Sequence, residues 1–65
     1  MNFERSGNYR LTISRDGYPD ADMDVRYDRQ EQHDGEEVHY FEGPGRFHLG
    51  IPEDLIGPDF RIEPA

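Results

Sequence analysis

The sequence predicts a small, mostly β domain of the α+β class. We expect an antiparallel sheet of three to five strands, with one short helical turn near residues 52–56. Two observations predict this fold: polar and apolar residues alternate with a period of two in several segments, and clusters of Gly, Pro and Asp separate those segments. A length of 65 residues allows one domain, 1–65, of which we expect residues 1–7 to be frayed.

The first predicted strand covers residues 8–15, where apolar and polar residues alternate. Its apolar face consists of Tyr9, Leu11 and Ile13. The turn-forming segment 16–19 follows, with the sequence Asp-Gly-Tyr-Pro. A five-residue connection, 16–20, would place Ile13 opposite Met23 and keep the apolar faces of the two strands on the same side.

The second predicted strand runs from about Ala21 to about Arg29. Its apolar face consists of Ala21, Met23, Val25 and Tyr27, and its polar face carries Asp20, Asp22, Asp24, Arg26 and Asp28. The competing interpretation is a helix near residues 20–32, begun by Pro19 and Asp20. The apolar residues of this segment do not recur at spacings of three and four, which favours the strand.

A hairpin is predicted at Asp34-Gly35, because this dipeptide tolerates the positive φ angles of a type I′ turn. A two-residue loop would pair Val38 with Glu31 and Tyr40 with Arg29. The core face of this third strand would contain Val38 and Tyr40. The opposite, acidic face would receive His39 and Phe41.

The remaining segments are shorter. Residues 43–45, Gly-Pro-Gly, break the chain, and residues 46–49 predict a short fourth strand. Pro52, followed by two acidic residues, is typical of the first turn of a helix. Residues 60–63 alternate again and predict a last strand at an edge of the sheet.

The charge is concentrated in one part of the chain. The net charge is −8, and nine carboxylates stand against two arginines between Asp20 and Glu42. Such a field repels nucleic acid and membranes and attracts basic surfaces. The absence of cysteine fits a reducing compartment, and no apolar run is long enough for a membrane span. We therefore expect a cytoplasmic, monomeric protein that contacts neither nucleic acid nor membrane directly.

The row of aspartates on the second strand is the main candidate site. Residues two apart on a strand lie about 6.6 Å apart, roughly twice the spacing of phosphates along one DNA strand. The row could therefore meet basic side chains that normally grip phosphates, or it could be a solvated face that keeps the protein soluble. On the first interpretation, the partner-binding residues are Asp20, Asp22, Asp24, Asp28, Glu31, Glu36, Glu37 and Glu42.

Other functions are less well supported. Five acidic residues in the segment 20–31 match calcium-ligand positions of an EF-hand loop, but Val25 occupies the position that needs Gly. The three histidines follow no zinc-ligand spacing, and no nucleophile motif is present. We therefore expect no metal, no cofactor and no catalytic residues. A calcium- or metal-binding module and an acidic antitoxin or assembly protein remain the alternatives.

In its size, its acidity and its lack of cysteine, the chain resembles the small phage-encoded anti-CRISPR proteins, in particular inhibitors of the type I-C system. Several such inhibitors act as DNA mimics on the basic channels of the surveillance complex. The resemblance covers the overall character of all 65 residues and transfers no individual site residue. It implies a non-enzymatic inhibitor that binds a basic, DNA-binding surface of a CRISPR effector subunit.

Overall fold

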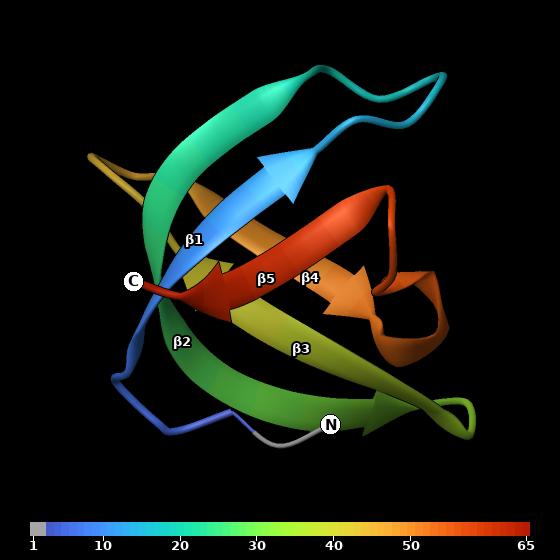
Figure 1. The fold of residues 1–65 in the computed structure, drawn as a ribbon. Coiled ribbons are helices and arrows are strands. Elements are labelled where there is room, and N and C mark those ends of the chain that lie inside the picture. Colours follow the sequence, from blue (N-terminus) through green and yellow to red (C-terminus); the bar gives the residue numbers. More distant parts are fainter. Residues whose placement is uncertain (1–2) are drawn as a thin grey trace.

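The computed structural model describes residues 3–65. Its strands are β1 (Asn8–Ile13), β2 (Ala21–His33), β3 (Glu36–Glu42), β4 (His48–Pro52) and β5 (Phe60–Pro64). They form one antiparallel sheet in the order β4-β3-β2-β1-β5 (Figure 1). The described residues contain one 3₁₀ turn, η1 (Glu53–Leu55), and no α-helix. The mostly β prediction is confirmed, and the predicted helical turn is this single 3₁₀ turn.

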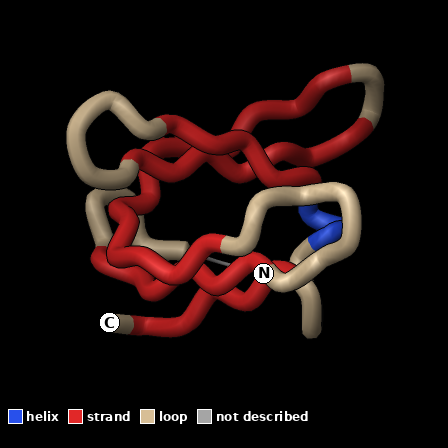
Figure 2. Tube along the Cα trace, turned by 90° about the horizontal axis from the view of Figure 1, so that it is seen from above, coloured by secondary structure: helices blue, strands red, loops and turns tan. Residues whose placement is uncertain are grey.

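The 13-residue strand β2 joins the two halves of the sheet, because it pairs with β1 along its first part and with β3 along its second. Figure 1 shows β2 curving, so that β1 and β5 lie in front of β3 and β4. Figure 2, seen from above, shows the strands in two layers. The sheet therefore folds over itself and encloses a core between its two halves.

Every strand contributes to this core. The buried apolar side chains are Leu11, Ile13, Val25, Tyr27, Phe41, Ile51 and Phe60. The odd-numbered apolar residues of β1 and of the first part of β2 point inward, as the alternation predicted. The period-two pattern therefore assigned the faces of these two strands correctly.

The β1–β2 connection is longer than predicted. Ile13 pairs with Ala21 and Leu11 pairs with Met23, so the connection spans the seven residues 14–20. The predicted pairing of Ile13 with Met23 was wrong by two residues. A two-residue shift leaves each side chain on the same face of the sheet, which explains why the core of this half was still predicted correctly.

The Asp34-Gly35 hairpin is confirmed. Both residues have positive φ angles, 51° and 81°, and Glu31 pairs with Val38. The hairpin extends β2 to His33, four residues beyond its predicted end at Arg29.

The predicted core face of β3 was wrong, because β2 contains a β-bulge. The register shifts between Tyr27, which pairs with Phe41, and Arg29, which pairs with Tyr40. The extra residue reverses the alternation of β2, so that the face that points inward before the bulge points outward after it. Val38 and Tyr40 therefore lie on the outer face. The residues that fill the core from β3 are instead His39 and Phe41, with 0% and 1% exposure.

The N-terminal segment 1–7 was expected to fray, and residues 1–2 lie outside the described part of the chain. Residues 3–7 lie along the bulged region of β2. The amide of Ser6 donates to the carbonyl oxygen of Tyr27 (2.9 Å), and the amide of Tyr27 donates to the carbonyl of Gly7 (3.0 Å). The Phe3 ring packs on the core, with its centroid 5.4 Å from that of Phe41.

The two ends of the sheet are β4 and β5. β4 begins two residues later than predicted and pairs with β3, and β5 pairs with β1, placing Phe60 opposite Ile13. The last strand therefore lies beside the first, as an edge strand. Within residues 3–65, no helix has the length and apolar character needed to cross a membrane.

Candidate functional site

The predicted acidic row on β2 is bound by an arginine of the neighbouring strand. Arg10 Nε lies 2.7 Å from Asp22 Oδ1, and Arg10 Nη1 lies 3.1 Å from Asp24 Oδ1. The hydrogen bond from Arg10 lowers the pKa of Asp22 below its usual value. The two central carboxylates of the row are therefore engaged within the sheet and form part of a mixed-charge face.

The carboxylates at the bulge and just after it also contact an arginine. Arg29 binds both Asp28 and Glu31, and its hydrogen bond lowers the pKa of Glu31. The Arg29 guanidinium lies over the ring of Tyr40, 4.4 Å from its centroid, and His33 Nε2 lies 3.0 Å from the Tyr40 hydroxyl. This part of the outer face is a self-contained group of ion pairs around one aromatic ring.

The eight predicted partner-binding residues thus do not form one continuous acidic row. Those with an arginine partner are Asp22, Asp24, Asp28, Glu31 and Glu42. Asp20 is exposed in the connection before β2, and Glu36 and Glu37 lie at the start of β3. The structure therefore separates the predicted set into an ion-paired outer face and an acidic end at the β2–β3 hairpin.

The acidic end has a cleft, which we call the acidic cleft, with a volume of about 420 Å³. Its lining residues are Gln32, Gly35, Glu36, Glu37, Glu53 and Asp54. The hairpin supplies the first four and η1 supplies the last two, because η1 packs against β3. Glu36 and Glu37 were predicted from the sequence as site residues. Glu53 and Asp54 were not, because they were interpreted only as acids at the start of a helical turn.

A buried histidine connects the core to the acidic cleft. His39 Nδ1 lies 3.0 Å from the Tyr27 hydroxyl, and His39 Nε2 lies 3.3 Å from Glu53 Oε1. A carboxylate only accepts, so Nε2–H donates to Glu53, and in the neutral imidazole Nδ1 accepts from the Tyr27 hydroxyl. Burial raises the pKa of Tyr27, which keeps its hydroxyl protonated as a donor. Both ring nitrogens of this buried side chain are therefore satisfied.

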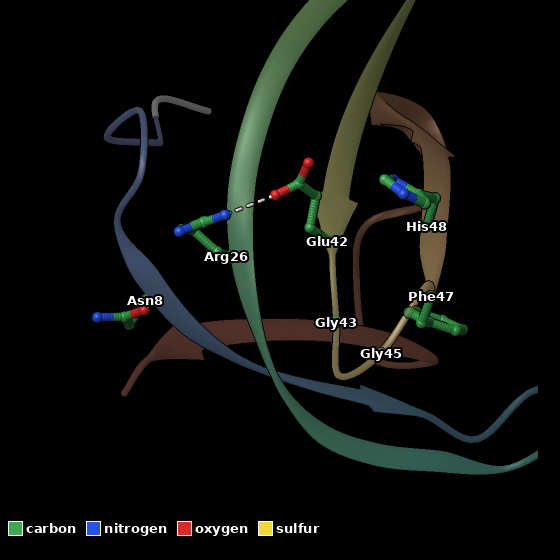
Figure 3. A pocket seen from close by; sticks show the side chains of 7 residues that line it. All are labelled: Asn8, Arg26, Glu42, Gly43, Gly45, Phe47 and His48. Atoms are coloured by element: carbon green, nitrogen blue, oxygen red, sulfur yellow. Dashed lines mark hydrogen bonds and ion pairs between the residues drawn. The ribbon is translucent and has the colours of Figure 1, made fainter.

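A second cleft lies at the opposite end of β3, beside the β3–β4 loop (Figure 3), with a volume of about 330 Å³. Its lining residues are Asn8, Arg26, Glu42, Gly43, Gly45, Phe47 and His48. Four of these are successive cross-strand partners, and we call them the transverse row: Asn8, Arg26, Glu42 and His48. Sequence reasoning missed this row because it depends on the pairing of four strands.

The segment considered for calcium is a strand. Residues 21–31 belong to β2, with Val25 buried in the core, and this extended geometry differs from the tight loop of an EF-hand. Within residues 3–65, no group of three or more His, Cys, Asp or Glu side chains is placed to hold a metal ion.

Comparison with known proteins found no matching protein family, no matching curated protein and no matching solved structure.

Proposed function

We propose that the protein is a non-enzymatic inhibitor that binds a basic, nucleic-acid-binding protein surface through its acidic end. The observation that supports this is the separation of charge over the molecule. The central carboxylates of β2 are ion-paired to Arg10, whereas the lining of the acidic cleft, within residues 3–65, contains four carboxylates and no arginine, and one of these, Glu53, contacts His39. The contact surface is therefore centred on the β2–β3 hairpin and η1, and the outer face of β2 plays a lesser part.

The mechanism we propose is mimicry of nucleic acid. Carboxylates on a rigid hairpin would take the positions of phosphates, and the partner's Lys and Arg side chains would enter the acidic cleft. The partner to test first is the DNA-binding subunit of a CRISPR surveillance complex, in the host cytoplasm, since the chain resembles small anti-CRISPR proteins in size and charge.

The first experiment measures the affinity of the protein for a purified type I-C surveillance complex at increasing NaCl concentrations. An electrostatic interface of this kind loses affinity steeply as salt rises, as a nucleic acid ligand does. Duplex DNA carrying the target should compete with the protein for the complex. An affinity that stays constant from low to high salt would contradict the proposal.

A pair of matched variants then tests which face makes the contact. Reversing Glu36, Glu37 and Asp54 to Lys should abolish binding, because the acidic cleft becomes basic. The control, Asp22→Asn with Asp24→Asn, should bind nearly as well as the wild type, because Arg10 already engages these two carboxylates. The reverse result would assign the contact to the outer face of β2.

A further inference from the structure

The transverse row places four polar side chains of different chemistry side by side on the outer face. Asn8 pairs with Arg26, Arg26 with Glu42, and Glu42 with His48, so each residue lies on the strand next to that of its predecessor. Neighbouring strands are about 4.8 Å apart, so an amide, a cation, an anion and an imidazole follow one another at that spacing. Figure 3 shows Arg26 between Asn8 and Glu42, with His48 on the far side of Glu42.

The wall of the cleft is fixed by the β3–β4 loop. The amide of Gly43 donates to the carbonyl of Phe47 (2.9 Å), and the amide of Phe47 donates to the carbonyl of Pro44 (3.3 Å). A Cβ at Gly43 would lie 2.7 Å from the Phe47 ring, so the ring rests directly on the glycine backbone. Phe47 is thus packed on the backbone of Gly43, and both residues line the cleft beside the row of polar groups.

The central ion pair of the row keeps free bonding capacity. Arg26 Nη2 lies 2.8 Å from Glu42 Oε2, and this hydrogen bond raises the pKa of Arg26 and keeps it charged. The two side chains are 59% and 33% exposed. A guanidinium has five N–H donors and a carboxylate has about four acceptor positions, so one shared hydrogen bond leaves donors and acceptors next to each other in the cleft.

We propose that this cleft binds a free α-amino acid with an apolar or aromatic side chain. Its carboxylate would accept from Arg26 and its ammonium would donate to Glu42, the two central groups of the row. Its side chain would lie against Phe47 and the glycines of the loop. A zwitterion carries both charges within a few ångströms, as the row requires, whereas a simple anion would meet Glu42 and the negative field of the whole chain.

This site is independent of the proposed inhibitor function. It lies at the end of β3 that contains Glu42, and the acidic cleft lies at the end that contains Glu36. Loss of one activity should therefore leave the other intact.

The test is a titration of the ¹⁵N-labelled protein with phenylalanine, followed by NMR. We expect saturable shifts at Asn8, Arg26 and His48. N-acetylphenylalanine lacks the ammonium and phenylalaninamide lacks the carboxylate, so each should bind at least about tenfold more weakly, the cost of one charged hydrogen bond. Equal binding of the three ligands, or no shift at the solubility limit of phenylalanine, would overturn the proposal.

Two substitutions separate the two ends of the ligand. Arg26→Gln should weaken the binding of phenylalanine at least about tenfold, and this variant should no longer prefer phenylalanine over phenylalaninamide. The Glu42→Gln variant should no longer prefer phenylalanine over N-acetylphenylalanine. The control is Arg61→Gln, which removes an arginine from β5, outside the cleft, and should leave binding unchanged. Folding of each variant is checked by its amide spectrum. Unchanged affinity in both folded cleft variants would contradict the proposal.

Discussion

His39 places an imidazole in the centre of an otherwise apolar core. Its side chain is fully buried, and its two nitrogens bind Tyr27 on β2 and Glu53 on η1. The Phe3 ring packs edge-on against it, with a centroid distance of 5.1 Å. One residue thus joins the sheet, the 3₁₀ turn and the N-terminal segment, and it holds a carboxylate that lines the acidic cleft.

The first prediction concerns this network. His39→Leu should lower the free energy of unfolding by about 1–3 kcal/mol, because the buried Tyr27 hydroxyl loses its partner. Adding Tyr27→Phe should restore part of the loss, since replacing both partners by apolar groups removes the unsatisfied hydroxyl. Urea unfolding of the two single variants and the double variant measures the coupling. Strictly additive effects would show that the hydrogen bond contributes nothing.

The second prediction concerns the ion pair between Arg10 and Asp22. The folded-state pKa of Asp22 is lowered, so this pair stabilises the fold above the unfolded pKa, and the contribution is lost as the pH falls through the folded pKa. Arg10→Gln should raise the pKa of Asp22 toward its ordinary value and reduce this acid-dependent loss. NMR titration of the Asp22 carboxyl group measures the change. The control is Arg46→Gln, which removes an exposed arginine from a loop. An unchanged Asp22 titration in Arg10→Gln would refute the assignment.

At the scale of elements, β2 shows which structural features its sequence pattern predicts and which it does not. The alternation from Ala21 to Tyr27 and the Asp34-Gly35 turn each predicted local structure correctly. The bulge at Asp28 lies between them and leaves no signal in the alternation, because the residues that follow it in β2, 29–33, are all polar. Two correct local predictions therefore combined into a wrong face for β3, and this error hid the burial of His39.

The third prediction tests the hairpin turn. Gly35 has a φ of 81°, a region that side chains with a Cβ rarely adopt, so Gly35→Ala should destabilise the protein by about 1–2 kcal/mol. Gly57→Ala is the matched control. No atom lies within 4 Å of a Cβ built there and its φ is outside the left-handed region, so it should be nearly neutral. Thermal unfolding of both variants compares them, and equal stability losses would count against a backbone origin.

At the scale of the whole molecule, the net charge could be predicted but its placement could not. The sequence shows −8 and a concentration of acids in its middle third. Which acids are neutralised depends on strand pairing, which brings Arg10 beside Asp22 and Arg26 beside Glu42. The acidic cleft depends on tertiary packing as well as on strand pairing, because Glu53 and Asp54 lie beside the hairpin only where η1 packs on β3.

The fourth prediction follows from this charge distribution. Adding NaCl at neutral pH should raise the unfolding midpoint, because the Debye length falls to about 8 Å at physiological ionic strength and screens repulsion at the acidic end. Glu36→Gln with Glu37→Gln should be more stable than the wild type at low salt and should respond less to salt. Calorimetric scans over a salt series test this. A midpoint that falls with salt would mean that the outer-face ion pairs dominate.

The pairing of β5 with β1 also constrains how the chain acquires its structure. Phe60 is 2% exposed and completes a core whose other members come from the first 51 residues, and the amide of Ala65 donates to the carbonyl of Asn8. A nascent chain lacking β5 would leave that part of the core open and one edge of β1 unpaired. The pairing of β1 with β5 is therefore a contact between distant residues of the chain, and we expect such contacts to slow folding relative to a fold built from local contacts.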